Sequence, residues 1–289
     1  MPRNCRITGP DNAFEIGRRR PLAIIAGPCV LESLEMALRV GAVARDACRE
    51  LGFNYIFKAS FDKANRTSAA SPRGPGIDTG LARLAEVRRA LRVPVTTDIH
   101  EPAQAGPVAE VVDALQIPAF LCRQSDLLEA AGAAAARHAR AVNIKKGQFL
   151  SPREMAGPVE KVERAGCTNI MLTERGTFFG YHRLVNDFIG IGDLMALGEE
   201  ASPPRAAPPV CFDCTHSAQL PGESATTGGR RDRVELLARA AAAVPVDALF
   251  LECHPDPPSA WSDAATQLPL DALPGLLRVV KAISSAAGK

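Results

Sequence analysis

Short apolar runs in this sequence end repeatedly in lysine or arginine, the side chains that neutralise bound anions. The cations at or just beyond the ends of such runs are Lys58, Lys63, Arg66, Arg123, Lys145 and Arg175. A lone cation of this kind is usually a surface ion-pair donor. If the run ends meet at one place, these side chains would surround phosphate or carboxylate groups with charge-assisted hydrogen bonds. The pattern therefore predicts a site for phosphorylated substrates.

A second group of residues combines a thiol, an imidazole and two carboxylates. Cys29 and His216 each end an apolar run, Glu252 ends another, and Asp263 lies in the segment that follows it. This donor set suits Zn, Fe or Mn, with a coordination position left open for water or substrate. Spacing alone also allows the plainer interpretation, because Cys and His at strand ends are often merely buried.

Cys211 and Cys214 have the C-x-x-C spacing that is common in zinc and redox sites. Residues three apart in an extended strand point to opposite faces. We therefore do not expect these two thiols to bind one metal together.

The elements that would position these residues form a regular alternation along the chain. Eight apolar runs predict strands at 22–29, 55–60, 93–100, 114–120, 141–147, 169–176, 210–216 and 248–255. Amphipathic stretches between and after them predict helices that include 33–51, 81–91, 126–140, 151–165, 231–244 and 269–284. Such alternation is typical of parallel βα units. Eight units favour a closed (β/α)8 TIM barrel, usually about 250 residues long, over an open doubly wound sheet.

The barrel interpretation gives each side chain a direction. In a TIM barrel the carboxyl ends of the strands carry the active site, and side chains alternate between the helices and the interior. Val142 and Ile144 suit the helix side, so Lys145 rather than Lys146 should point into the barrel mouth. By the same parity Glu252 points inward, where a buried carboxylate requires a partner.

Composition narrows the class of protein. The 289 residues are 46% hydrophobic and carry a net charge of +2, which argues against a nucleic-acid or membrane-binding surface. No apolar run is long enough for a membrane span, and no secretory signal is evident. Most of the eight cysteines are then expected to be buried thiols in a cytoplasmic protein. We expect one catalytic domain over residues 1–289, with 1–21 as an N-terminal lead-in in which Arg18, Arg19 and Arg20 are solvated.

Longer motifs closely resemble the signatures of 3-deoxy-D-manno-octulosonate 8-phosphate synthases. They are KASFDKANRTS at 58–68, RGPG at 73–76, QIPAFLCRQ at 116–124, NIKKGQF at 143–149, TERG at 173–176 and ECHPDP at 252–257. The likeness runs from about Leu22 to Ile283. It implies a barrel, typically tetrameric, that condenses phosphoenolpyruvate with D-arabinose 5-phosphate and water in lipopolysaccharide biosynthesis, with release of phosphate.

The resemblance also implies a divalent metal ion. Family members without metal carry Asn where this chain has Cys29, so the segment from Ala26 to Cys29 resembles the metal-dependent class, as do 215–222 and 262–264. The implied ligands are Cys29, His216, Glu252 and Asp263. The metal would polarise the aldehyde, orient the sugar or activate water, and the resemblance leaves these three roles and the identity of the metal open.

Substrate-binding and catalytic roles carry over by motif. Phosphoenolpyruvate would be held by Lys63, Gln124, Lys145 and Arg175, and the aldose phosphate by Asn65, Arg66 and Thr67, the last two reaching a neighbouring subunit's site. Lys58 and Asp98 complete the expected substrate site, and Cys29, Lys63, Lys145, His216 and Asp263 are the expected catalytic residues. The chain departs from the family pattern at Ala69, Ala70, Pro72 and Cys214 and in the loop 222–229.

Three other functions remain as alternatives. The related aromatic-pathway synthases use erythrose 4-phosphate, but usually show Lys-Pro-Arg-Thr where this chain has residues 63–67. A Schiff-base aldolase would use Lys145 or Lys146 covalently. A sugar-phosphate sensor without catalysis would have little need for a metal set beside two anion sites.

Overall fold

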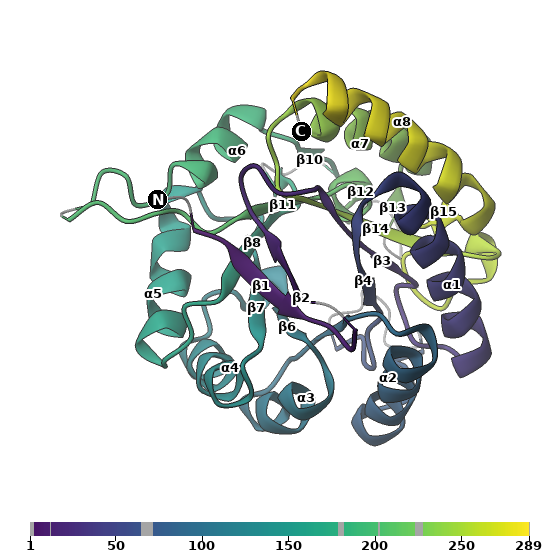
Figure 1. Ribbon diagram of the computed structural model, residues 1–289, viewed down its shortest axis with the longest axis horizontal. Coiled ribbons are helices and arrows are strands. Elements are labelled where there is room, and N and C mark those ends of the chain that lie inside the picture. The colour runs from purple at the N-terminus through teal and green to yellow at the C-terminus, as the bar shows by residue number, and fades with distance from the viewer. Residues whose placement is uncertain are drawn as a thin grey trace.

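The computed structural model describes residues 3–11, 13–64, 72–178, 182–201, 203–222 and 228–288, and its centre is a closed barrel of parallel strands (Figure 1). In order around the barrel the strands are β3 (Ala23–Gly27), β4 (Asn54–Lys58), β5 (Val95–Asp98), β6 (Ala114–Ile117), β7 (Ala141–Lys145), β8 (Ile170–Glu174), β11 (Val210–Asp213) and β14 (Ala248–His254). Pairing of β14 with both β11 and β3 closes the ring. The predicted (β/α)8 barrel is confirmed.

Eight helices surround the strands. They are α1 (Leu34–Leu51), α2 (Ile77–Leu91), α3 (Ala105–Val111), α4 (Ser125–His138), α5 (Ala156–Arg164), α6 (Phe188–Met195), α7 (Val234–Ala243) and α8 (Leu273–Ala286). Local signals set their ends: the Ser33 side chain accepts the Met36 N–H at the start of α1, and Gly52 ends that helix with φ 71°. Ser151 marks the approach to α5, where its N–H and hydroxyl both donate to Glu154.

The strands separate two apolar layers. Val142, Ile144, Leu249 and Leu251 pack outward against the helices, whereas Phe250 lies in the barrel interior. The predicted alternation of side chains is therefore confirmed for β7 and β14. Cys211 lies in the interior layer and Cys214 in the outer one, as expected for residues three apart in a strand.

The N-terminal segment is more than the predicted lead-in. β1 (Cys5–Thr8) and β2 (Ala13–Ile16) form an antiparallel hairpin that crosses the amino-terminal end of the barrel in Figure 1. Cys5, Ile7 and Ile16 are fully buried and pack against the interior layer of the barrel. The prediction missed this hairpin because each strand has only four residues. Arg18, Arg19 and Arg20 are exposed, as expected.

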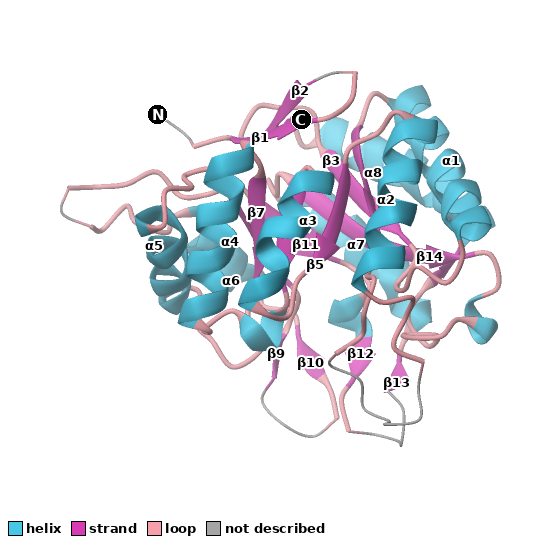
Figure 2. Ribbon diagram, turned by 90° about the horizontal axis from the view of Figure 1, so that it is seen from below, coloured by secondary structure: helices cyan, strands magenta, loops and turns pink. Residues whose placement is uncertain are grey.

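The opposite end of the barrel carries further short strands. β9 (Thr177–Phe178) pairs with β10 (Leu184–Val185), and β12 (Gln219–Leu220) pairs with β13 (Gly228–Gly229). Figure 2 shows both pairs at the carboxyl ends of the barrel strands, away from β1 and β2. β15 (Leu268–Pro269) adds to the end of β14. Longer connections thus gather at the end where the active site was predicted.

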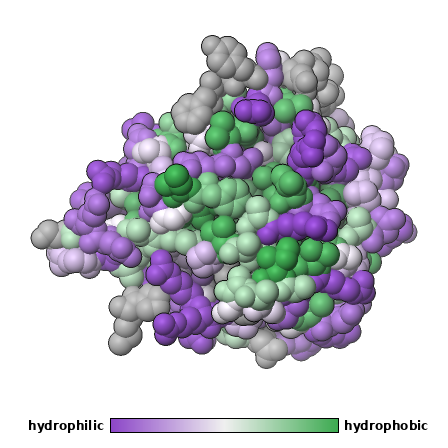
Figure 3. Space-filling model, turned by 90° about the horizontal axis from the view of Figure 1, so that it is seen from above, coloured by the Kyte–Doolittle hydropathy of each residue, from purple (hydrophilic) through white to green (hydrophobic). Residues whose placement is uncertain are grey.

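The outer surface is mixed in polarity. Figure 3 views the flank at the top of Figure 1, along which α6 and α8 run, and apolar side chains gather across its middle. Among the described residues, no helix combines the length and the apolar character that crossing a bilayer would require.

Candidate active site

A cavity of about 450 Å³ opens at the carboxyl ends of the barrel strands. Its walls bring together residues that are far apart in the sequence. Among the described lining residues are Lys58, Lys63, Asp98, His100, Gln116, Lys145, Gln148, Arg175, His216, Gln219 and Asp263. Four of the six cations that were expected to meet at the mouth of the barrel line this cavity: Lys58, Lys63, Lys145 and Arg175.

Lys145 enters the cavity from β7 and is held from two sides. Its Nζ donates to Oδ2 of Asp213 at 2.7 Å and lies 3.8 Å from the centre of the Phe250 ring. Burial opposes the charge on Asp213, but His216 and Lys145 together hold the pKa of this carboxyl well below its usual range. Lys146, in contrast, turns away to donate to the backbone oxygen of Leu150 at 3.0 Å. The choice of Lys145 over Lys146 agrees with this geometry.

Arg175, at the end of β8, is positioned by neighbours that leave part of it unused. Its Nη2 donates to Oε1 of Gln219 at 2.5 Å. Oε1 of Glu174 accepts the N–H groups of Arg175 and Gly176, which fixes the backbone. Nη1 is buried with no hydrogen-bond partner among the described residues, and burial lowers the pKa of this guanidinium. A buried donor without a partner is costly, so this atom suits an anionic ligand.

Lys63 and Asp98 also line the cavity, and each influences the charge of the other. Asp98 accepts a hydrogen bond from Ser60 and lies 3.1 Å from Nε2 of His100. Burial opposes its charge, yet Lys63 and His100 hold the Asp98 pKa well below its usual range. Burial likewise opposes the charge on Lys63, but Cys29, Asp98 and Glu252 raise its pKa, so Lys63 remains a cation.

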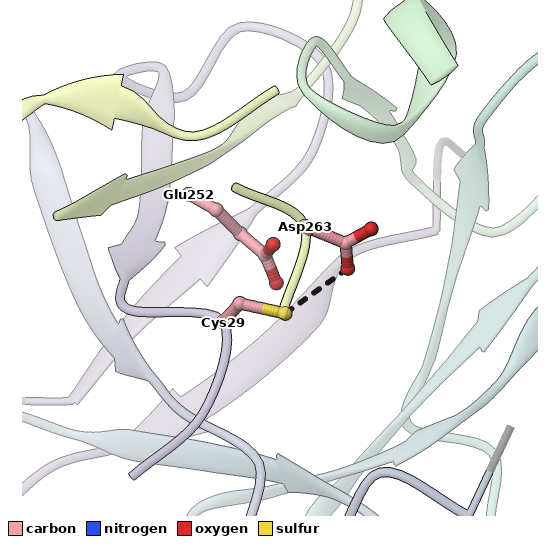
Figure 4. Close-up of side chains that lie close together, drawn as sticks. All are labelled: Cys29, Glu252 and Asp263. Atoms are coloured by element: carbon pink, nitrogen blue, oxygen red, sulfur yellow. Dashed lines mark hydrogen bonds between the residues drawn. The ribbon is translucent and has the colours of Figure 1, made fainter. Parts of the chain in front are cut away.

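Cys29, Glu252 and Asp263 converge at one side of the cavity, and their donor atoms all lie within 4.8 Å of one another (Figure 4). The Cys29 thiol donates to Oδ2 of Asp263 at 3.1 Å. His216 lies beside them, with Nε2 3.6 Å from Oε2 of Glu252 and 3.7 Å from Oδ2 of Asp263. The structure thus brings the four predicted ligands to one place.

Local structure explains the convergence. Gly27 lies so close to the backbone of Lys58 that a Cβ would overlap its carbonyl oxygen, which lets the turn into Cys29 pass against β4. Asp263 adopts φ 50°, a region that Asp enters more readily than most residues. Its carbonyl oxygen accepts the N–H groups of Thr266 and Gln267. These contacts turn the Asp263 side chain toward the Cys29 thiol.

The residues present fit a divalent metal ion. Oε2 of Glu252 is completely buried and has no hydrogen-bond donor among the described residues, although a buried carboxylate oxygen ordinarily has one. Burial and the nearby Glu252 raise the pKa of the Cys29 thiol well above its usual value. Burial opposes the charge on Asp263, but His216 lowers its pKa. One S, one N and two carboxylate donors are a set that Zn, Fe or Mn accepts.

Not every predicted residue reaches the cavity. Gln124 is exposed at the start of α4, and Arg123 beside it is also exposed, so neither is among the described lining residues. Gln116, the third residue of β6, is buried and lines the cavity instead. The two glutamines differ because Gln116 lies within β6, whose side chains can point into the barrel, whereas Gln124 lies after the strand, beside α4. Asn65, Arg66 and Thr67 lie outside the described residues.

The sequence prediction assigned no role to Gln116 and Gln219, which line the cavity, or to Asp213, which contacts two lining side chains. Gln116 was readable from strand parity, since it lies two residues after Ala114, which faces the interior. Asp213 ends β11, and its contact with Lys145 joins β11 to β7, while its contact with His216 is local. Gln219 connects Arg175 to Asp263, to which its Nε2 donates at 2.7 Å. No sequence pattern indicates that bridge.

Known proteins are similar to this chain over nearly its whole length. The model of the DAHP synthetase I family matches residues 6–288. The chain is 50% identical over 263 residues to the 2-dehydro-3-deoxyphosphooctonate aldolase of Nitratidesulfovibrio vulgaris, covering 91% of this chain and 92% of the relative. It is 50% identical over 278 residues to the protein of the same name from Cyanothece sp., covering 96% of each. The chain therefore belongs to the DAHP synthetase I family, and its curated relatives are named 2-dehydro-3-deoxyphosphooctonate aldolase.

Proposed function

We propose that this enzyme condenses phosphoenolpyruvate with D-arabinose 5-phosphate. C3 of the enol phosphate bonds to the aldehyde carbon, whose oxygen takes a proton, while water adds at C2 and phosphate leaves C2. The product is the eight-carbon keto-acid phosphate after which the curated relatives are named. The observation that carries the proposal is Nη1 of Arg175, which is buried without a hydrogen-bond partner among the described residues, in a side chain that lines the cavity together with Lys63 and Lys145.

Two anionic substrates repel each other, and the cavity offsets that repulsion. Lys145 and Arg175 approach from β7 and β8, and Lys63 approaches from the segment after β4. Their positive charges would bind the phosphate and carboxylate of phosphoenolpyruvate and hold its C3 near the aldehyde. Orientation of this kind can contribute up to about 7 kcal/mol toward the barrier. We propose that Asp98, whose pKa is held well below its usual range beside Lys63, accepts a hydrogen bond from the sugar.

A divalent metal ion is part of the proposal, with Cys29, His216, Glu252 and Asp263 as its ligands. When bound, it would supply a Lewis acid that polarises an oxygen atom or acidifies water. In the protein itself, Lys58 neutralises Oε1 of Glu252 from 2.5 Å, and the second oxygen, Oε2, is left for the ion.

A Schiff-base mechanism has less support. Nζ of Lys145 is held by Asp213 and the Phe250 ring, and Lys146 is buried 3.4 Å from Glu174 and directed to backbone oxygens. Neither amine is free to attack a carbonyl. Borohydride trapping with each substrate should therefore leave the protein unlabelled, and a covalent adduct on either lysine would favour the aldolase alternative.

Release of inorganic phosphate tests the main proposal. Purified protein should release phosphate with phosphoenolpyruvate and arabinose 5-phosphate, and much more slowly with erythrose 4-phosphate. Chelation should abolish release, and added Zn, Mn or Fe(II) should restore it. The Cys29→Ser variant should lose metal affinity and turnover together. Faster release with erythrose 4-phosphate would support the aromatic-pathway reaction, and full activity in chelator would contradict the metal role.

We also propose a homotetramer in the cytoplasm. Phe120 and Phe149, each 53% exposed, lie near the cavity end, and Ile189 on α6 is 80% exposed. Apolar area also gathers on the flank in Figure 3. The eight free, buried cysteines suit a reducing compartment. Light scattering of the purified protein tests the assembly, and a monomer would contradict it.

A further inference from the structure

Asp213 makes an unusual number of contacts for one carboxylate. It ends β11 and is completely buried. Its Oδ1 accepts the N–H of Thr215 at 3.2 Å, the hydroxyl of Thr215 at 3.1 Å and the N–H of His216 at 2.9 Å. Its Oδ2 faces Nζ of Lys145 at 2.7 Å and Nδ1 of His216 at 2.8 Å. Three local donors thus fix Oδ1, and Oδ2 serves two side chains of the cavity.

We propose that Asp213 is a positioning residue that serves both halves of the active site. The metal half consists of Cys29, His216, Glu252 and Asp263, and the anion half consists of Lys63, Lys145 and Arg175. Through one oxygen atom it aims His216 at the metal and Lys145 at the anionic substrate. The inference rests on the proposed function, because it assigns Lys145 and His216 the roles given there. Asp213 itself touches neither the metal nor the substrate.

The contact with His216 selects which ring nitrogen is available. An ionised carboxylate only accepts hydrogen bonds, so the imidazole must present N–H at Nδ1 toward Oδ2. Nε2 is then the nitrogen left to bind a metal in the neutral imidazole, and it faces Glu252 and Asp263, where the metal ligands converge. Carboxylate partners of this kind orient metal-binding histidines and fix their tautomer.

The contact with Lys145 directs the ammonium group. Oδ2 of Asp213 and the Phe250 ring contact Nζ from two sides, and Lys145 lines the cavity. The same oxygen atom is therefore shared by the metal half and the anion half. A change confined to that atom should disturb both halves at once.

Asp213→Asn makes such a change with almost no change in volume. The three donors around Oδ1 keep the amide oxygen in that position, so the amide nitrogen replaces Oδ2. This nitrogen donates, and it would face Nδ1 of His216 and Nζ of Lys145. The imidazole would then accept at Nδ1 and carry its proton on Nε2, which is the wrong nitrogen for metal binding.

The test measures metal and substrate binding separately from turnover. Competition with a chromophoric chelator should show zinc affinity lowered by about 10–100-fold in Asp213→Asn, the range seen when such partners of metal ligands are removed. Calorimetry on metal-free protein should show weaker phosphoenolpyruvate binding as well. Unchanged affinities for zinc and for phosphoenolpyruvate would overturn the proposal, even if turnover fell.

Asp247→Asn is the matched control. Asp247 is also buried, and its Oδ2 accepts the N–H of Val210 at 2.8 Å, at the opposite end of β11. This variant should keep both affinities near those of the unchanged protein. A similar loss in both variants would mean that any buried aspartate here acts through stability alone, which would overturn the positioning role.

A measurement on the unchanged protein keeps the proposal testable if Asp213→Asn fails to fold. Nitrogen NMR of the zinc-loaded protein should show zinc on Nε2 of His216 and a proton on Nδ1. Zinc on Nδ1 would overturn the proposal. If the unchanged protein releases no phosphate from the substrate pair, the proposed function fails, whereas the zinc and NMR results still decide the role of Asp213 toward His216.

Discussion

Lys58 and Glu252 form an ion pair on the wall of the cavity, with Nζ of the lysine 2.5 Å from Oε1 of the glutamate. They come from β4 and β14, the two neighbours of β3, and both side chains are almost wholly buried. Lys58 also donates to the carbonyl oxygen of Cys29 at 3.2 Å. The sequence argument that Glu252 must have a partner is thus confirmed, and the partner also holds the backbone of a predicted metal ligand.

Replacing Lys58 should destabilise the metal-free protein. In Lys58→Met, the buried Glu252 would lose the lysine that pairs with its Oε1, and removal of one partner of a buried ion pair typically costs about 3–5 kcal/mol. Zinc would supply positive charge at Oε2, so the loss in unfolding free energy should shrink when zinc is present. Urea unfolding with and without chelator measures both values. Lys161→Met on the outer helix α5 is the control, and an equal loss with and without zinc would contradict the prediction.

The barrel could be predicted because burial makes apolar residues recur at regular spacings. In a strand, it also makes side chains alternate between the interior and the helices. Strands of four to seven residues alternate with helices, and inward residues such as Lys145 are separated from outward ones such as Val142 by that alternation. Parity also decides against Lys146. Pairings between side chains of different strands have no such local signal, which is why the contacts of Asp213 and Gln219 became visible only in the structure.

The N-terminal hairpin shows where sequence patterns are too weak. Its strands have four residues each, and their apolar side chains gain stability from the barrel end rather than from the hairpin itself. Asn169 also anchors the hairpin, since its side chain accepts the N–H of Arg6 and donates to its carbonyl oxygen, both at 2.7 Å. A lead-in and a structural cap look alike until these contacts are seen.

Shortening a buried side chain of the N-terminal hairpin should lower the free energy of unfolding without changing substrate binding. Ile7 is completely buried against the barrel interior, so Ile7→Ala should lower the free energy of unfolding by about 2–5 kcal/mol. The neighbouring Thr8 is exposed, so Thr8→Ala should change it by less than about 0.5 kcal/mol. Urea unfolding compares the two variants. The KM for phosphoenolpyruvate should be the same in both, and a large rise in Ile7→Ala would contradict a purely structural role.

The two glutamines of one motif provide a direct test of the corrected site. Gln116 lines the cavity, where its Oε1 accepts from Asn143 at 3.3 Å, whereas Gln124 is exposed. Gln116→Ala should lose a hydrogen bond to a charged substrate group, worth about 1.5–3 kcal/mol. This corresponds to a fall in kcat/KM of about 10–100-fold. Steady-state phosphate release should show almost no change in Gln124→Ala. The reverse pattern would restore the prediction made from sequence.

Replacing Gln219 should weaken the binding of both the metal and phosphoenolpyruvate, because its amide contacts one residue of the metal half and one of the anion half. Its Oε1 accepts from Arg175 and its Nε2 donates to Oδ1 of Asp263, whose Oδ2 faces Cys29. Met is similar in size but makes neither bond, so Gln219→Met should free both the guanidinium and the carboxylate to move. Each lost bond involves a charged group and is worth about 1.5 kcal/mol, or about tenfold in affinity. Zinc competition and phosphoenolpyruvate calorimetry should therefore both show weaker binding, with Gln124→Met as the control. A change in only one of the two affinities would mean that the bridge supports that half alone, and would contradict the connection argued from these contacts.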